Sequence, residues 1–283
     1  MEIKPLVSVN VRTYNSGRTL RGTLESVKKQ SYKNIEIIIS DGYSKDNTIS
    51  IAKEFDAKIG YADKLGDARY QAYVNSKGKY VFSVDSDQVL DAKLIETCVH
   101  ECEVNKYNAL IIAEKSFLRK GTLLEKILQY DKWIINQTHD SDAVFGTACP
   151  RFFKRDLLED VKWPKELSIF DDTVLYAQLI SKGAKVKYIS DQFITHNEVT
   201  SWIVFAKKFF RYGKGYIGAL KVKPMTIAAH SLPRRSYFSK LAFSKPHYFL
   251  GLMVLYSVKV SAATLGALSA ILSGVFSKNK NAN

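Results

Sequence analysis

Apolar and polar positions alternate in blocks along the first part of the chain, and these blocks predict strands and helices in regular succession. Residues 6–11 alternate apolar and polar side chains as a strand does, and residues 20–27 repeat leucine and valine at the spacing of one helix face. The same order recurs downstream, with strands predicted at 35–39, 57–61 and 79–84 and helices at 48–55 and 67–75. Because strands that alternate with helices favour a parallel sheet, the sequence predicts an α/β fold.

Two carboxylates follow the strand predicted at 79–84. Asp85 and Asp87 flank Ser86, and ligands of open α/β sheets bind beyond the carboxyl ends of the strands. Side chains two positions apart in a strand face the same side, so both aspartates can converge on one divalent ion such as Mg²⁺ or Mn²⁺. A plain turn after a strand uses the same residue types, so the tripeptide fits either a metal site or a turn.

A second acidic pair, Asp171 and Asp172, precedes a predicted helix. Val174 and Leu179 belong to its apolar face, and Gly183 ends it. The free N–H groups and the dipole at a helix's amino end stabilise a carboxylate there. Helix capping therefore accounts for one of the two aspartates without a catalytic role. The second aspartate is then a candidate for another task, such as accepting a proton.

The last part of the chain is strongly apolar. From His247 to Phe276 the one charged residue is Lys259. A bilayer core of about 30 Å takes about 20 apolar residues in a helix, so this stretch can form one tilted span. Two short helices broken near Lys259, or a buried helix of a soluble protein, fit the same residues. The small residues between 262 and 269 suit helix packing in lipid, and we expect membrane insertion.

A basic and aromatic stretch precedes this segment. Its aromatic residues recur at helical spacing with cations between them: Trp202, Phe205, Lys207, Lys208, Phe209, Arg211, Tyr212, Lys214 and Tyr216. Such a helix can lie in the membrane interface or pack on the preceding domain. The net charge of +14 would also suit nucleic acid, but no segment resembles a nucleic-acid-binding module, and the cations concentrate beside the apolar segment. We therefore expect a membrane partner and no nucleic acid, with the N-terminal domain on the cytoplasmic face.

The three cysteines exclude one class of protein. Cys98, Cys102 and Cys149 are odd in number and contain no Cys-x-x-Cys pair, which argues against a disulfide framework and against a zinc cluster. They fit a reducing compartment or use as small apolar side chains.

Four motifs resemble, in their order, the landmarks of the family 2 glycosyltransferases, which have the GT-A fold. They are Val9-Asn10-Val11-Arg12-Thr13-Tyr14-Asn15, Ser40-Asp41-Gly42-Tyr43-Ser44-Lys45-Asp46-Asn47-Thr48, Gly66-Asp67-Ala68-Arg69 and Asp85-Ser86-Asp87. The resemblance covers roughly the first 215 residues, and four ordered motifs are far more specific than any one of them. It implies a Rossmann-like, mostly parallel sheet flanked by helices, an inverting reaction, and Mn²⁺ or Mg²⁺ as cofactor.

The resemblance also implies residues that bind the donor. The positions that match nucleotide contacts of the family are Thr13, Tyr14, Asp41, Arg69 and Asp85. Asp85 and Asp87 match the metal-binding aspartates, and His196 matches a histidine that some members use as a further metal ligand. Taken alone, Asp41 also fits a turn, Arg69 a solvated helix cation, and His196 a partly buried side chain.

The remaining implied residues concern catalysis and phosphate. Asp172 matches the catalytic base, and Asp171 stands where the family usually has glutamate. Gly146 belongs to a stretch that resembles the glycine-containing strand beside the sugar. Lys208 or Arg211 is expected to contact phosphate.

Together these roles describe an inverting glycosyltransferase that moves a hexose, either mannose from GDP-mannose or glucose from a UDP donor. A hydroxyl acceptor needs a base whereas a lipid phosphate does not, so the acidic pair leans toward a hydroxyl on a polyprenyl or dolichyl lipid-linked acceptor. The expected domains are the catalytic domain at 1–200, basic amphipathic interfacial helices at 201–245, and a hydrophobic membrane segment with a short polar tail at 246–283. The alternatives are a catalytically silent nucleotide-sugar or glycan-binding membrane protein, and a structural protein of the membrane surface.

Overall fold

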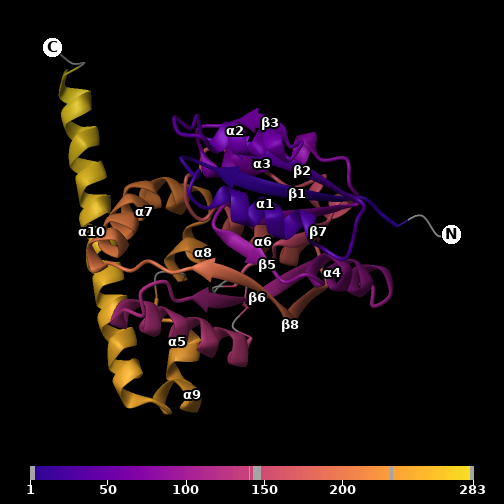
Figure 1. Ribbon diagram of the computed structural model, residues 1–283. Helices are drawn as coiled ribbons and strands as arrows, with labels where there is room; N and C mark the ends of the chain where they lie inside the picture. The colour runs from indigo at the N-terminus through magenta and orange to yellow at the C-terminus, as the bar shows by residue number, and fades with distance from the viewer. Residues whose placement is uncertain (1–3, 140, 143–147, 230–231, 281–283) are drawn as a thin grey trace.

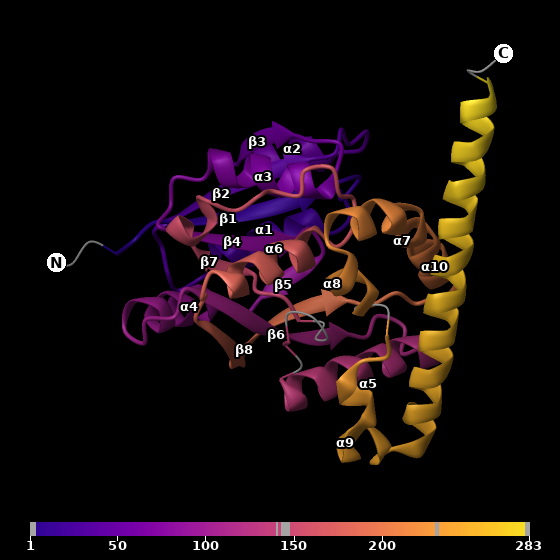
Figure 2. The same cartoon turned by 180° about the vertical axis from the view of Figure 1, so that it is seen from behind.

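One mixed sheet forms the centre of the protein (Figures 1 and 2). In the computed structural model, residues 4–139, 141–142, 148–229 and 232–280 are described. The strands, in chain order, are β1 (Val7–Thr13), β2 (Ile35–Asp41), β3 (Lys58–Tyr61), β4 (Tyr80–Asp85), β5 (Gln88–Leu90), β6 (Ala109–Phe117), β7 (Phe152–Lys154) and β8 (Val186–Asn197). Within the described residues they pair in the order β3-β2-β1-β4-β7-β6-β8-β5.

The part of the sheet formed by β3, β2, β1 and β4 is parallel, as the alternation of strands and helices predicts. β7 runs antiparallel to β4 and β6, β5 runs antiparallel to β8, and β6 and β8 are parallel. The predicted α/β fold is confirmed, and the antiparallel strands make the sheet mixed. Arg12 lies in register with Asp85, and Thr13 with Asp41, so β1, β2 and β4 end at one edge of the sheet.

Helices cover both faces of this sheet. They are α1 (Leu20–Lys28), α2 (Thr48–Glu54), α3 (Leu65–Asn75), α4 (Leu94–Glu103), α5 (Leu123–Thr138) and α6 (Asp171–Ser181). On one face α1, α2 and α4 share a core with the strands that includes Leu24 and Phe82. On the other face α3 and α6 pack through Tyr73 and Leu179.

A second apolar core joins α5 to two C-terminal helices, α7 (Trp202–Val222) and α10 (Pro246–Lys280). The short helices α8 (Pro224–Ala229) and α9 (Lys240–Phe243) lie between them in sequence. Both overall views show α10 along one side of the molecule, against α7 and α5 (Figures 1 and 2). The helix continues through Lys259, so the alternative of two broken helices is not observed. In the described part of the chain, α10 is the one helix long and apolar enough to cross a membrane, over Pro246–Ser273.

Glycines allow α7 and α10 to approach closely. A Cβ atom at Gly213 would lie 1.9 Å from the backbone oxygen of Ala263, and one at Gly266 would lie 2.0 Å from that of Phe210. No side chain fits at such distances, and small residues are what lets two helix backbones touch. The crossing fixes the middle of α10 to α7.

Candidate active site

Two arginines hold Asp85 at the end of β4. Arg12, beside it on β1, places Nη2 2.6 Å from Asp85 Oδ1, and Arg151, just before β7, places Nη1 3.0 Å from Asp85 Oδ2. Burial alone would raise the pKa of Asp85, but Arg151 and Arg12 outweigh burial and hold this pKa well below its usual range. Both oxygens of this carboxylate are therefore engaged by arginines.

Asp171 is engaged in the same way, whereas Asp172 is not. Arg69 Nε lies 2.8 Å and Arg12 Nη1 3.4 Å from Asp171 Oδ2, and the Asp171 side chain is almost completely buried. Burial would raise the pKa of Asp171, and Arg69 and Arg12 lower it overall. Asp172 accepts the backbone N–H of Thr173 at 2.8 Å and, among the residues that the structure describes, forms no ion pair. Of the two carboxylates, Asp172 is the one left to accept a proton.

Asp87 and His196 come together although they are remote in sequence. The pairing of β5 with β8 sets Gln88 beside His196 and brings His196 Nε2 to 3.4 Å from Asp87 Oδ2. Nδ1 of the same ring is buried, has no hydrogen-bond partner among the described residues, and lies 4.0 Å from Glu198 Oε1. In metal sites, one ring nitrogen binds the ion while an acid orients the other. This pair therefore fits a divalent cation.

Asp85, the third predicted metal ligand, faces its two arginines instead of this pair. Within the described ranges, no group of three or more His, Cys, Asp or Glu side chains could hold a metal ion. A cation at Asp87 and His196 would complete its shell with water and phosphate oxygens, which is how Mg²⁺ is commonly bound.

A chain of contacts between acidic and basic side chains connects the two ends of the site. Its members, in order, are Asp85, Arg151, Glu114, Lys132, Glu198, His196 and Asp87. Glu114 is central, with Arg151 Nη2 2.9 Å and Lys132 Nζ 3.2 Å from its carboxylate. Burial alone would raise the pKa of Glu114, but Lys132 and Arg151 lower it to about 2. Such a network fixes the positions of its members relative to one another.

We expect Glu114→Gln to lower the melting temperature at neutral pH by on the order of 5 °C. The folded-state pKa of Glu114 lies below its unfolded value, so its contribution to stability is complete above that unfolded value, near pH 4.5, and is lost as the pH falls toward 2. The difference in melting temperature between wild type and variant should therefore close between about pH 5 and about pH 2. Thermal melts across this range test it, and a difference that does not change with pH would contradict it.

The residues expected to border the nucleotide lie at the ends of β1 and β2. Asp41 is fully buried and accepts hydrogen bonds from Thr13 Oγ1 (2.6 Å), Ser44 Oγ (2.6 Å) and Ser44 N (2.7 Å). Tyr14 is 66% exposed and lies close to Gly42, where a Cβ would be 3.2 Å from its ring. Asp41 thus braces the loop, and Tyr14 presents an open aromatic face.

Two further tyrosines extend this aromatic surface. Tyr43 follows β2 and Tyr61 ends β3, and their rings stack with centroids 5.4 Å apart while both remain about half exposed. Exposed aromatic rings are surfaces on which a base can stack. The sequence did not single out these two residues, although aromatic residues at strand ends were the available signal.

Asp172 lines a cavity of about 200 Å³ between β6, α5 and the segment before β7. Charged side chains dominate its wall: Arg69, Glu114, Asp131, Lys132, Arg151, Asp172 and Arg234. Cations of this kind suit phosphate oxygens, and carboxylates suit sugar hydroxyls. The cavity therefore brings a candidate base together with groups that recognise both parts of a sugar phosphate.

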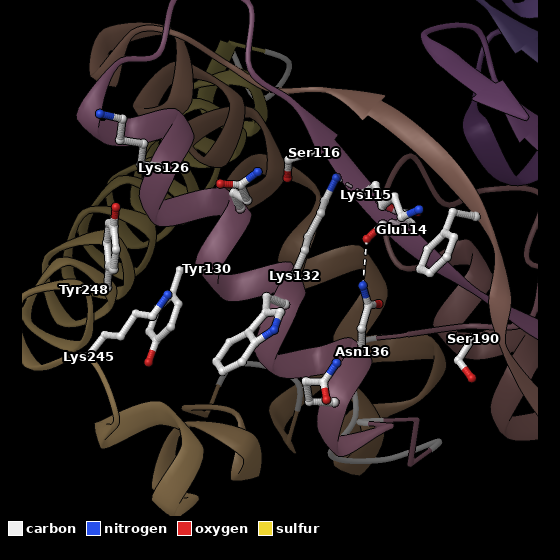
Figure 3. Close-up of a pocket in the computed structure, with 14 residues that line it drawn as sticks. Glu114, Lys115, Ser116, Lys126, Tyr130, Lys132, Asn136, Ser190, Lys245 and Tyr248 are labelled. Atoms are coloured by element: carbon white, nitrogen blue, oxygen red, sulfur yellow. Dashed lines mark hydrogen bonds and ion pairs between the residues drawn. The ribbon is translucent and has the colours of Figure 1, made fainter. Parts of the chain in front are cut away.

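A larger cavity of about 510 Å³ adjoins the first, and Glu114, Lys132 and Asn136 line both. Figure 3 shows this cavity along α5, with Tyr248 and Lys245 of the C-terminal region at one end and Ser190 at the other. Its aromatic wall is stacked: the ring of Tyr130 lies 5.4 Å from Trp133 and 5.2 Å from Tyr248. Lys245 Nζ lies 5.7 Å from the Trp133 ring. The wall of the larger cavity therefore contains both aromatic rings and lysine ammonium groups.

Two predicted residues, Lys208 and Arg211, are not part of the described walls of these cavities. Gly146 lies outside the described residues. Arg211 is exposed on α7, and Lys208 lies with its Nζ 5.8 Å from the ring of Tyr212. Neither is part of the described wall of the smaller cavity, where Arg151 and Arg234 supply cations instead.

Sequence reasoning also missed Arg12, Glu114 and Arg151. Arg12 and Glu114 follow uninterrupted runs of buried residues in β1 and β6. Burying a charge at such a position costs free energy unless an opposite charge pairs with it. Each of these two residues therefore indicated that a residue of opposite charge from another part of the chain packs against it. No comparable signal identifies Arg151.

Comparison with known families and proteins identifies the family of this chain. The model of glycosyl transferase family 2 matches residues 8–162. Glycosyltransferase GlyG of Streptococcus pneumoniae is 32% identical over 212 residues, which cover 66% of this chain and 68% of that protein. The Escherichia coli UDP-Glc:alpha-D-GlcNAc-diphosphoundecaprenol beta-1,3-glucosyltransferase WfaP is 36% identical over 126 residues, or 41% of this chain. This chain spans half the length of WfaP.

Solved structures share the fold. Mannosyltransferase PcManGT from Pyrobaculum calidifontis, in complex with GDP-Man and Mn²⁺, has a TM-score of 0.60 and 17% identity, over 97% of this chain and 80% of that one. S. aureus TarS 1–349 in complex with UDP-GlcNAc has a TM-score of 0.55 and 16% identity, over 95% of this chain and 92% of that one.

Proposed function

The chain belongs to glycosyl transferase family 2, and from this premise we propose that it is an inverting hexosyltransferase acting from a nucleotide sugar on a lipid-linked acceptor at a membrane surface. One observation carries the proposal: at the carboxyl edge of the sheet, Asp87 and His196 lie 3.4 Å apart, and Asp172 lines a cavity together with Arg69 and Arg151. A cation site, phosphate-binding groups and a candidate base are what such a transfer requires.

The proposed donor site extends along the sheet edge. Tyr14, Tyr43 and Tyr61 offer ring faces to the base, and Asp41 keeps the loop between them in shape. Arg151, in the wall of the smaller cavity and held by Asp85 and Glu114, is the cation proposed to face the diphosphate. A bound Mn²⁺ or Mg²⁺, held by Asp87 and His196 near Asp85, would neutralise charge on the departing nucleoside diphosphate.

The acceptor hydroxyl attacks the anomeric carbon as the nucleoside diphosphate leaves from the opposite face. Its proton must be accepted as the new bond forms, and a positioned carboxylate does this. We assign that role to Asp172, because Asp171 is engaged by Arg69 and Arg12. Asp171 is assigned to positioning: it anchors the start of α6, where Asp172 stands.

The proposed donors are GDP-mannose and UDP-glucose. WfaP is named for transfer of glucose from UDP-Glc to a diphosphoundecaprenol-linked sugar, and PcManGT was solved with GDP-Man. Both relatives support a nucleotide-sugar donor for this chain, and WfaP supports a polyprenyl lipid-linked acceptor.

The larger cavity supports a glycan on that acceptor. Flat aromatic faces suit the apolar faces of sugar rings, and Lys126 and Lys245 suit a phosphate beyond them. Because Lys132 and Asn136 line both cavities, an acceptor in the larger one would direct its end toward Asp172.

We expect Trp133→Ala to raise the KM for the lipid-linked acceptor about tenfold, because one stacking face is lost, and to leave the KM for the donor unchanged. Trp133→Phe keeps a ring and should restore most of the acceptor affinity. Initial rates with each substrate varied in turn test this, and an equal rise of both KM values would argue against an acceptor site.

The proposed domains follow the same division. Residues 1–200 form the catalytic domain, residues 201–245 the basic amphipathic helices, and residues 246–283 the hydrophobic membrane segment. Nucleotide sugars are made in the cytoplasm, so the catalytic domain is proposed to face it.

A thermal-shift screen of GDP-mannose and UDP-glucose with and without Mn²⁺ identifies the donor, because a ligand that binds the folded state raises its melting temperature. Transfer from that donor to a polyprenyl-diphosphate-linked sugar then tests the reaction. Donor binding without transfer to any lipid acceptor would favour the alternative of a catalytically silent nucleotide-sugar or glycan-binding membrane protein. That alternative is less favoured because a protein that only binds nucleotide sugar or glycan does not need Asp172 as a base.

A further inference from the structure

The outward face of α10 is apolar and open. Leu250, Val254, Leu265 and Leu268 recur along it at helical spacing, and each is half exposed or more. The one charge of the segment, Lys259, lies toward the protein, with its Nζ 5.5 Å from the ring centroid of Phe209. A surface helix of a soluble protein places charges outward and apolar residues inward. The reverse arrangement is typical of a helix that faces lipid.

The inward face of α10 packs on α5 and α7 between Tyr248 and Gly266. Near its start, the ring of Tyr248 stacks on Tyr130 of α5, and Gly251 fits against Ile127. Farther along, Ala263 and Gly266 meet α7 at the glycine crossing. An α10 that crossed a bilayer in this conformation would carry α5 and α7 with it.

Those two helices carry exposed charges that a bilayer core does not accommodate. Lys126 on α5 and Lys207 and Lys214 on α7 are all exposed. Charged side chains at membrane depth are rare, and they face a protein interior or a water-filled cavity. The packing of α10 on α5 and α7 therefore argues against a span over Pro246–Ser273.

The part of α10 beyond the crossing is too short to span by itself. Residues 267–280 rise about 21 Å, whereas the hydrocarbon core of a bilayer is about 30 Å thick. In Figure 1 this end of the helix projects past α7.

Cations lie beside the apolar face. Arg211 and Lys214 are exposed, and each directly follows a residue of α7 that touches α10, namely Phe210 and Gly213. A row of cations beside an apolar face fits the boundary between phosphates and acyl chains of an anionic leaflet.

We propose that α10 lies lengthwise in one leaflet of an anionic membrane, with its outward face at the acyl boundary and the cations of α7 at the lipid phosphates. The tilted transmembrane span expected from the sequence is replaced by an in-plane helix that holds the catalytic domain side-on to the membrane. This inference concerns attachment and does not depend on the reaction, so either can fail without the other.

Vesicle binding by the full-length protein tests the surface. Wild type should sediment with phosphatidylcholine vesicles containing about one-third phosphatidylglycerol, and Leu265→Glu with Leu268→Glu should weaken partitioning at least about tenfold. Val74→Glu with Val104→Glu is the matched control, since both valines are exposed apolar residues on elements away from α10 and should leave binding unchanged. Glutamate is a good helix former, so the α10 variant should keep the wild-type melting temperature.

Depth measurements separate an in-plane helix from a span. Val254→Cys and Leu268→Cys, each labelled with a fluorophore in a Cys149→Ser background, should be quenched by brominated lipids at the same shallow depth. A span would separate the two labels by about 21 Å in depth, and that result would overturn the proposal. Failure of wild type to bind vesicles, with self-association that Leu265→Glu and Leu268→Glu abolish, would overturn it in favour of a second copy covering this face.

Discussion

Replacing Asp172 by asparagine should lower kcat by about 10²–10⁴-fold while leaving the donor's dissociation constant nearly unchanged. Asparagine keeps the size of the side chain and its hydrogen bond from Thr173 N, but it cannot accept the acceptor's proton. Single-turnover rates with labelled donor, together with donor titration by thermal shift, test both parts of the expectation. A variant that keeps wild-type kcat would remove Asp172 as the base.

Asp171→Asn is the matched control, because it changes the adjacent carboxylate in the same way. Asp171 is buried between Arg69 and Arg12, so the substitution leaves two cations without their shared partner. Breaking a buried ion pair on one side costs about 3–5 kcal/mol, and we expect a clear drop in melting temperature. Asp172→Asn should leave the melting temperature close to that of wild type. The two substitutions thus distinguish a base from a positioning residue by stability as well as rate.

The parallel part of the fold was predictable because the pattern of apolar and polar residues within each segment is enough to identify its strands and helices. Each of β1, β2 and β4 is a run of apolar or alternating residues, and each is followed by a polar loop. The order of strands and helices then restricts the topology to very few choices. The short strands β5 and β7 gave no comparable pattern, since three residues show no period. The register of β6 against β8 shifts after Ile112, and no local pattern in the sequence indicates such a shift.

The sequence names candidate site residues but not how they are arranged. The motif order pointed to Asp85, Asp87, Asp171 and Asp172, yet it could not tell which carboxylates are paired with arginines. That outcome depends on Arg12, which reaches both Asp85 and Asp171 from the neighbouring strand. The arrangement depends equally on strand pairing between segments that are remote in sequence. Such pairing cannot be predicted from either segment alone.

Lys259 shows the same limit for the C-terminal segment. Length and lack of charge marked the segment as apolar, and both properties hold for a helix that crosses a bilayer or lies in it. Which face is covered is decided by contacts with α5 and α7. These contacts place Lys259 on the inward face of α10, and the sequence pattern does not predict this orientation.

Asp87→Ala is expected to abolish the response of the protein to Mn²⁺ and to lower kcat/KM about a thousandfold, which is the effect of losing charge neutralisation at the leaving group. Asp87 is more than one-third exposed, and its carboxylate lies 3.4 Å from His196 Nε2, so the metal-free variant should melt like metal-free wild type. Isothermal titration with Mn²⁺ in the presence of nucleoside diphosphate tests the metal separately from the rate. His196→Ala should weaken Mn²⁺ binding at least tenfold by the same assay.

Asp85→Ala provides the contrast, because Asp85 is held by Arg12 and Arg151 and Asp87 is not. Removing Asp85 leaves two neighbouring arginines without the carboxylate that separates their positive charges. This variant should therefore have a lower melting temperature than wild type, with or without Mn²⁺. If Asp87→Ala kept wild-type Mn²⁺ affinity, the cation would have to bind elsewhere. If only Asp87→Ala lost Mn²⁺ affinity and only Asp85→Ala lost stability, the two aspartates would have separate roles: Asp85 orders the arginines, and Asp87 holds the ion.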